Sequence, residues 1–180
     1  MNNIKTILSE LRIYLCNRIV NRIPSRRVRR FFYISCMRYR LDPAASIFMG
    51  VTFSAADHFS MKRNSVINPH CHIDVRGGIE IGENVSISER VSIVTGDHNP
   101  ADPHFRARFR PVKVEDHVFI GYGAIILGNV VLGKGSVIAA GSLVQKDVEP
   151  FSIVGGVPAK KIGTRNQVLQ RDRPYSRLFH

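Results

Sequence analysis

The chain has 180 residues, of which 44% are hydrophobic and 22% charged, and its formal net charge is +12 at pH 7. This length suits one domain with a substantial core. Residues 1–40 contain ten Lys or Arg and one acid, Glu10, and therefore carry +9 of the total. Because the remainder is close to balanced, we do not expect the rest of the chain to bind nucleic acid.

The three cysteines have no paired spacing, which favours a reducing compartment over a disulfide framework. No apolar run approaches the ~20 residues needed to span a bilayer. The start of the chain also lacks the basic and then apolar pattern of a signal peptide. These features predict a cytoplasmic protein, with a peripheral position at the inner face of the membrane as the alternative.

Residues 1–45 are predicted to form a basic, amphipathic helical segment. Pro24 ends a first helix, and Ser25 can cap a second one that continues to about Arg40. Three interpretations stay open: a hairpin that packs on the end of the following domain and caps it, a helix lying weakly on an anionic membrane, and a nucleic-acid contact. The first helix carries an aliphatic stripe on one face: Ile4, Ile7, Leu8, Leu11, Leu15 and Ile19.

Residues 46–164 are organised by a period of six. A period of six is a multiple of two, so aliphatic residues at this spacing stay on one face of short strands. An unbroken short period is typical of a solenoid, in which each turn buries its apolar face against the next. Between Ile47 and Ile93 the phase slips twice by two residues, which indicates longer turns between coils. The regular part contains Val114, Ile120, Ile126, Leu132, Ile138 and Val144.

The register is lost between Ile93 and Val114, over 21 residues, which is not a multiple of six. We therefore expect a loop, residues 99–111, to be extruded from the solenoid directly after His98. Long loops inside compact domains are usually functional or disordered. A polar tail is expected over residues 165–180.

The repeats, together with GGVPAKKI at residues 155–162 and TGDHNP at residues 95–100, resemble the hexapeptide-repeat acyltransferases, in particular their sugar and polysaccharide O-acetyltransferase branch. The resemblance covers roughly residues 61–164. It implies a mainly β fold, a left-handed parallel β-helix. It also implies acetyl-CoA as the acetyl donor, a sugar hydroxyl as the acceptor, and a homotrimer in which each active site lies between two chains.

His98 is the candidate catalytic residue. A hydroxyl is a weak nucleophile at neutral pH, and an imidazole, which titrates near neutrality, can remove its proton during attack on a thioester. The resembled family uses the histidine at this place as that general base. A turn histidine without a chemical role is the alternative.

Asn68 and Asp97 are candidate substrate-binding residues. Asn68 matches an asparagine that contacts substrate in the resembled family, although an asparagine that turns a corner of the solenoid is nearly as good an interpretation. Asp97 stands where a small inward residue is usual, so its carboxylate needs hydrogen-bond partners. We expect these partners to be backbone amides of the turn rather than a neighbouring side chain.

Arg106, Arg108 and Arg110 surround Ala107, which stands where maltose- and galactoside-type relatives have a glutamate. The loop is more similar to that of acetyltransferases of surface-polysaccharide pathways. Arg pairs bidentately with phosphate and carboxylate groups. An acceptor that carries such a group is therefore expected: a nucleotide sugar, a lipid-linked sugar or a uronic acid.

Five residues match positions that contact coenzyme A in the resembled family: Tyr122, Ala140, Gln145, Lys146 and Lys160. Their lysines can meet the nucleotide phosphates, and for each lysine a solvated surface charge is the alternative. No metal site is expected.

Three other functions stay open. A xenobiotic (antibiotic) acetyltransferase would share the solenoid and the histidine, and a non-enzymatic trimeric scaffold would need no histidine beside the loop. A zinc enzyme similar to carbonic anhydrase would use histidine ligands. The chain has His70, His72, His98 and His117, but they lack the close spacing of that family's ligands.

Overall fold

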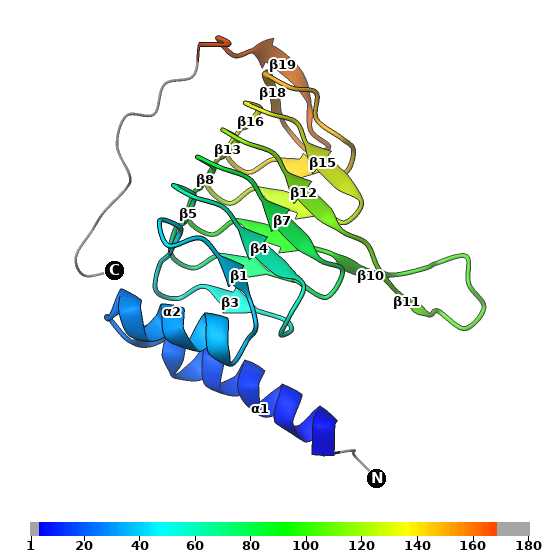
Figure 1. Cartoon of the computed structure of the whole chain (residues 1–180). Coiled ribbons are helices and arrows are strands. Elements are labelled where there is room, and N and C mark those ends of the chain that lie inside the picture. Colours follow the sequence, from blue (N-terminus) through cyan, green and yellow to red (C-terminus); the bar gives the residue numbers. More distant parts are fainter. Residues whose placement is uncertain (1–3, 169–180) are drawn as a thin grey trace.

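The computed structural model describes residues 4–168 and shows a β-helix solenoid with a layer of helices at one end and a hairpin on one side (Figure 1). Three parallel sheets form the walls. The first sheet contains β1 (Arg40–Leu41), β4 (Phe59–Met61), β7 (Ile79–Ile81), β12 (Val112–Val114) and β15 (Val130–Leu132). The second contains β2 (Ser46–Ile47), β5 (Val66–Ile67), β8 (Ser86–Ile87), β13 (Phe119–Ile120), β16 (Val137–Ile138), β18 (Ser152–Gly155) and, antiparallel to β18, β19 (Lys160–Thr164). The third contains β3 (Thr52–Phe53), β6 (His72–Ile73), β9 (Ser92–Val94), β14 (Ile125–Leu127) and β17 (Leu143–Val144).

The aliphatic residues of the six-residue period stack in register inside the solenoid. In the second sheet Ile67 pairs with Ile87, Ile87 with Ile120, and Ile120 with Ile138, and all four are 0% exposed. Burying one such side chain contributes about 1.5–3 kcal/mol. The predicted parallel solenoid is thus confirmed, while its left-handed winding rests on the resemblance.

The phase slips in the sequence correspond to coil length. Ile47, Ile67 and Ile87 pair in successive coils although they are twenty residues apart, whereas Ile120 and Ile138 are eighteen apart. Three repeats of six need eighteen residues, so each early coil has two extra residues in its turns. The slips therefore mark longer turns, as predicted.

The N-terminal segment consists of α1 (Ile4–Arg18), a 3-10 turn at Val20–Arg22 and α2 (Arg26–Ser35). The prediction that the second helix runs to Arg40 is wrong. Tyr39 is buried with Tyr33 and Phe53 in an aromatic cluster, and Arg40 already belongs to β1, which pairs with β4. The solenoid ladder therefore begins five residues before the boundary expected at residue 45.

These helices cap the open end of the first coil through their polar side chains. Some N–H groups of each coil donate to carbonyls of the next coil, for example Ser46 to Ser65, and others donate to the preceding coil, for example Ile79 to His58. The first coil has no preceding coil, so its carbonyls on that side lack backbone donors, and buried carbonyls need partners. Side chains of the helical segment supply the missing donors: Arg30 to Leu41 and Asp42, Arg26 to Pro43 and Ala45, Arg29 to Ile47, Asn21 to Val51 and Asn17 to Phe53.

The expected capping role is thus confirmed, but by polar groups. The sequence left open whether the aliphatic stripe of α1 packs on the solenoid or on a membrane. In the structure most of it does not pack on the solenoid, because Ile7, Leu8 and Leu11 are each about half exposed. The buried side of α1 includes Cys16 instead. No described helix is long and apolar enough to cross a membrane. Residues 1–3 and, in the expected tail, 169–180 lie outside the described residues.

Candidate active site

A β-hairpin projects from the corner between the third and first sheets, where β9 leads to β12 (Figure 1). Its strands are β10 (Gly96–His98) and β11 (Ala107–Phe109), which pair antiparallel with His98 opposite Ala107. The extruded loop predicted after His98 is thus present. The pairing inside it was not predicted, because its strands lie outside the six-residue period.

Asp74 anchors the base of this hairpin from the coil below. Its carboxylate accepts hydrogen bonds from the backbone N–H groups of Thr95 and Gly96, at 3.1 and 2.9 Å, and from the guanidinium of Arg76 at 2.8 Å. Burial alone would raise the pKa of Asp74, but the bonds from Arg76 and Gly96 outweigh it and lower the pKa to about 2. The guanidinium of Arg76 also lies 5.0 Å from the ring centroid of Phe109, which joins the second strand of the hairpin to the same anchor.

The sequence analysis missed Asp74, although a signal was present. Ile73 pairs with Ile93, and Ile93 with Ile126, so Asp74 occupies the place that Val94 and Leu127 fill in the next two coils. A carboxylate at a place that is aliphatic in the next two coils indicates a specific hydrogen-bonding role.

His98 lies exposed at the end of β10, with a fixed ring orientation. Its ring stacks on Phe105, with centroids 4.7 Å apart and planes 9° apart, and its Nδ1 lies 2.7 Å from the backbone oxygen of Phe105. Because a carbonyl can only accept, Nδ1 carries the proton of this bond. The lone pair of the neutral ring is therefore on Nε2, which can act as a general base.

The four charged candidates, Asp97, Arg106, Arg108 and Arg110, all form ion pairs within residues 97–110. Asp97 accepts two bonds from Arg108, both 2.8 Å, and one of 2.7 Å from Arg110. Arg106 binds Asp102 at 2.6 Å. Hydrogen bonds from Arg108 and Arg106 lower the pKa of Asp97 and Asp102, respectively. The expectation that Asp97 bonds backbone amides is wrong, because its partners are the guanidinium groups of Arg108 and Arg110. The carboxylate that bonds the backbone amides of this turn is Asp74.

Asn68 and two of the predicted coenzyme A contacts lie on a different edge of the solenoid. Asn68, Tyr122 and Ala140 follow β5, β13 and β16, at the corner between the second and third sheets. Asn68 donates its side-chain amide to the carbonyl of Ile87 at 2.7 Å, which is a bond that stabilises the corner. Tyr122 is 50% exposed, and its carbonyl accepts from the N–H of Gly141 at 2.8 Å.

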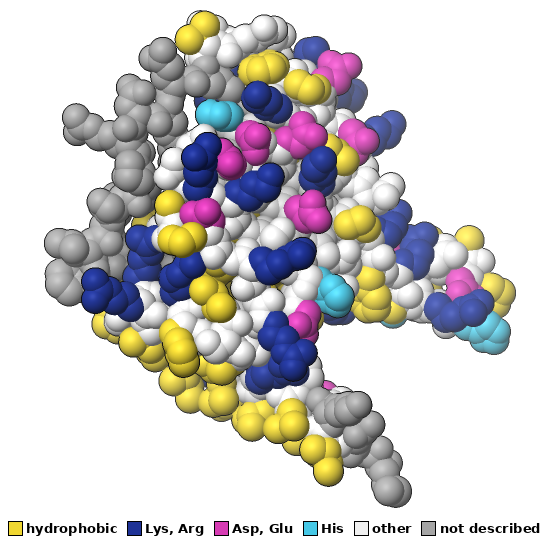
Figure 2. Space-filling model, in the orientation of Figure 1, with side chains coloured by type: hydrophobic (Ala, Val, Ile, Leu, Met, Phe, Trp, Pro, Cys, Tyr) yellow, Lys and Arg dark blue, Asp and Glu magenta, His cyan; other side chains and the backbone are white. Residues whose placement is uncertain are grey.

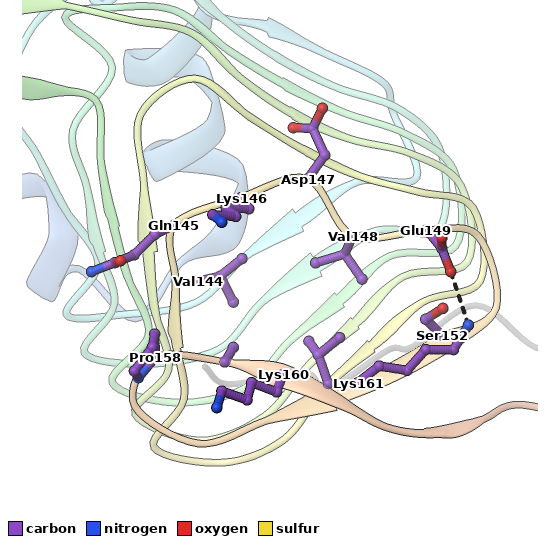
Figure 3. Close-up of a pocket in the computed structure, with 12 residues that line it drawn as sticks. Val144, Gln145, Lys146, Asp147, Val148, Glu149, Ser152, Pro158, Lys160 and Lys161 are labelled. Carbon is purple, nitrogen blue, oxygen red and sulfur yellow. Dashed lines mark hydrogen bonds and ion pairs between the residues drawn. The ribbon is translucent and has the colours of Figure 1, made fainter.

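The other three predicted coenzyme A contacts line one pocket at the far end of the solenoid (Figure 3). This pocket, of about 540 Å³, lies between the turn after β17 and strand β19 and includes Gln145, Lys146 and Lys160. Lys161 also lines it but is paired with Glu149 at 2.8 Å. The ammonium groups of Lys146 and Lys160 have no hydrogen bond or ion pair within residues 4–168, so they are available to an anion.

The hairpin and this pocket share one edge. The chain leaves β9 and β17 at the same corner, and β14 lies between these two strands in the third sheet. Two strand spacings correspond to about 10 Å along the edge. Within one chain the structure therefore brings His98 and Lys146 to one edge and leaves Tyr122 and Ala140 on another. Over the described residues, no group of three or more His, Cys, Asp or Glu is placed to hold a metal ion.

Comparison with known proteins agrees with the solenoid fold. Residues 111–146 match the family model "Bacterial transferase hexapeptide (six repeats)". The chain is 34% identical over 119 residues to dTDP-4-amino-4,6-dideoxy-D-glucose acyltransferase of Escherichia coli, covering 57% of this chain and 62% of that protein. It is 32% identical over 128 residues to galactoside O-acetyltransferase of Escherichia coli strain K12, covering 69% of this chain and 62% of that protein.

Two further matches define the range of relatives. Serine acetyltransferase of Salmonella typhimurium is 29% identical over 151 residues, which cover 76% of this chain and 51% of that protein. The solved structure of galactoside acetyltransferase in complex with coenzyme A has a TM-score of 0.73 at 24% identity, covering 93% of this chain and 86% of that chain. The chain covers at most 62% of the length of each of these three curated relatives. Residues 111–146 are thus similar to the hexapeptide repeats of bacterial transferases, and the chain has the solenoid fold seen in the galactoside acetyltransferase structure.

Proposed function

We propose that this protein transfers an acetyl group from acetyl-CoA to a hydroxyl of a sugar, with His98 as the general base. The observation that carries this proposal is the bond between Nδ1 of His98 and the carbonyl of Phe105, which leaves the lone pair on an exposed Nε2. Relatives named as a galactoside O-acetyltransferase and as a sugar acyltransferase support the reaction class.

The reaction follows from this tautomer. Nε2 takes the hydroxyl proton while the oxygen attacks the thioester carbonyl. When the tetrahedral intermediate collapses, the carbon–sulfur bond breaks and the thiolate receives the proton from the imidazolium. The products are an acetyl ester and coenzyme A, and His98 is again neutral. The Phe105 carbonyl keeps the ring in the same orientation throughout and stabilises its cationic form.

The proposed donor site is the pocket at the far end of the solenoid. Lys146 and Lys160 would meet phosphate groups of the coenzyme, and Gln145 lies beside them. Support comes from a structural neighbour whose complex contains coenzyme A. A coenzyme bound in this pocket could extend its acyl end along the shared edge toward His98.

We further propose a homotrimer. Tyr122 and Ala140 lie on a different edge from His98, so one chain cannot place all the candidate residues around one site. If the hairpin edge of one chain faces the Tyr122 edge of a neighbour, both sets line the same cleft. Mixing a His98→Ala chain with a Tyr122→Ala chain, each inactive alone, should then restore part of the activity. Full activity in a protein that light scattering shows to be a monomer would contradict this arrangement.

The proposed acceptor is a sugar of surface polysaccharide synthesis, in line with the loop sequence. The three arginines suggested an acceptor with a negative charge, but the structure does not require one. Asp97 and Asp102 pair with all three, so the cluster has a net charge of only +1. A neutral sugar therefore fits the hairpin as well as an anionic one does.

A second candidate is transfer to the amino group of a nucleotide-linked aminosugar, which the dTDP-aminosugar acyltransferase relative favours. The test is release of the coenzyme A thiol from acetyl-CoA with paired acceptors that differ only in a hydroxyl or an amine. Turnover with the hydroxyl sugar supports the first proposal, and turnover restricted to the amine supports the second. Turnover only with serine or an antibiotic would overturn both.

A further inference from the structure

The outward face of the helical layer is apolar. On α1 the aliphatic stripe points away from the solenoid, with Ile4 73%, Leu8 53% and Leu11 49% exposed, and Tyr14 beside them is 59% exposed. Figure 2 shows hydrophobic side chains in a nearly continuous band along the helical end of the molecule. Contiguous exposed apolar surface of this kind is rare on soluble monomers and marks an interaction site.

Helix α2 continues this apolar face, because its charged side chains lie toward the solenoid and its apolar side chains lie outside. Its side toward the solenoid carries Arg26, Arg29 and Arg30, whose guanidinium groups bind carbonyls of the first coil. Its outward side carries Phe31, which is 70% exposed, and Val28, which is 48% exposed. These arginines are therefore hydrogen-bonded to the end of the solenoid, and the apolar residues of α2 are exposed on its other side. We call the outward surface of both helices the outer helical face: Ile4, Ile7, Leu8, Leu11, Tyr14, Ile19, Val28, Phe31 and Ile34.

The remaining cations of the segment distinguish between possible partners. Arg18, Arg22 and Arg27 are exposed, and their guanidinium groups have no hydrogen bond or ion pair with any residue of 4–168. At 100° per residue, Arg18 lies within the α1 stripe and Arg27 lies between Phe31 and Ile34 on α2. The only acid in residues 1–40 is Glu10. An apolar helical face interspersed with unpaired arginines is typical of helices that lie in the interface of an anionic bilayer.

We propose that the outer helical face docks on an anionic membrane surface, with its apolar side chains among the headgroups and Arg18, Arg22 and Arg27 against lipid phosphates. Charge complementarity favours the bilayer over a second copy of the chain, because two such faces would bring six unpaired arginines together. The face lies at the end of the solenoid opposite the lysine pocket, so docking leaves that pocket in solution (Figure 1). The inference does not depend on the proposed acetyl transfer.

The experiment is co-sedimentation of the full-length protein with vesicles of equal parts phosphatidylglycerol and phosphatidylcholine, at low and high salt. Binding should be clear at low salt, weaker at high salt, and absent from vesicles of phosphatidylcholine alone. Replacing Arg18, Arg22 and Arg27 with Gln should weaken binding about fivefold for each arginine removed. The matched control removes three exposed lysines that lie in or shortly after strands of the first sheet, Lys62, Lys113 and Lys134, and should bind as the wild type does.

A second pair of variants tests the apolar side chains. Leu8→Gln with Phe31→Gln should abolish vesicle binding, whereas Phe119→Gln with Ile125→Gln, which changes exposed apolar residues of the solenoid, should not. Circular dichroism checks that both variants are folded. Absence of wild-type binding at low salt, or equal binding by the Leu8/Phe31 variant, would overturn the proposal. A third outcome would also overturn it: the Leu8/Phe31 variant has a lower oligomer mass and the wild type does not bind vesicles. The outer helical face would then be a contact between copies of the chain.

Discussion

The coils and the hairpin of this molecule are stabilised by different interactions. The coils depend on stacked aliphatic side chains such as Ile87 and Ile120, which are 0% exposed. The hairpin has an exposed strand β10, and ion pairs, one aromatic stack and the buried carboxylate of Asp74 position it. The hairpin can therefore be changed with little effect on folding, while the coils can be weakened without moving His98.

The largest expected effect is on catalysis. His98→Ala should lower kcat by roughly 10²–10⁴-fold, the usual contribution of a general base. The melting temperature should hardly change, because the side chain is exposed and buries no core surface. Steady-state kinetics and thermal unfolding of the same preparation measure both. Activity within threefold of the wild type would remove His98 from the mechanism.

A substitution in the coils should lower stability and leave kcat nearly unchanged. Ile87→Ala should lower the free energy of unfolding by about 2–5 kcal/mol, because the side chain is fully buried between two coils. At a temperature where the variant remains folded, kcat should stay near that of the wild type. Urea unfolding measures the first quantity, and Ile125→Ala, a 41% exposed position, is the control. A loss below 1 kcal/mol would show that the aliphatic ladder is less important than its burial indicates.

Asp74 connects the two regions, so its replacement should affect both. The pKa of this carboxyl lies below its ordinary value of 3.8, at about 2, so the folded state favours the ionised form. Its contribution, about 2 kcal/mol, is present above pH 3.8 and is lost as the pH falls through 2. In Asp74→Asn the pH dependence of stability between pH 4 and 2 should be shallower. The value of kcat should fall, because the amide has one accepting oxygen instead of two and cannot hold both Arg76 and the Thr95 and Gly96 N–H groups. An unchanged pH profile would contradict this role.

The smallest effects are expected at the lysine pocket. Lys146→Gln and Lys160→Gln should each weaken coenzyme A binding roughly fivefold, since each removes one cation that meets a phosphate group. Calorimetric titration gives the dissociation constants, with Lys113→Gln as the control outside the pocket. If neither variant differs from this control, the coenzyme does not use the pocket.

The sequence was sufficient for the solenoid because its signal is periodic. Residues six apart must share one face of short strands, so Ile120, Ile126 and Leu132 predicted a solenoid before any contact was known. The helical end was less predictable. An aliphatic stripe on α1 identifies a helix but not the direction of the stripe, and the unpaired carbonyls that attract Arg26 and Arg30 exist only once the first coil is folded.

The candidate site could be predicted only in part. The place of His98 beside an interrupted register follows from the sequence. The choice of partners does not, because Asp97 can bond backbone amides or guanidinium groups, and only the pairing of β10 with β11 brings Arg108 opposite it. Asp74 could have been found by aligning the coils at their true length, which the slips of two residues obscured.

The polar cap of the first coil has a consequence for self-association. A solenoid that ends in unpaired carbonyls presents a template on which another chain can add its own strands, as occurs at unprotected sheet edges. Here Asn17, Asn21 and the α2 arginines occupy those acceptors, and at the opposite end the antiparallel β19 terminates the stack. Without the helical segment, copies of this solenoid would be expected to join end to end into fibres.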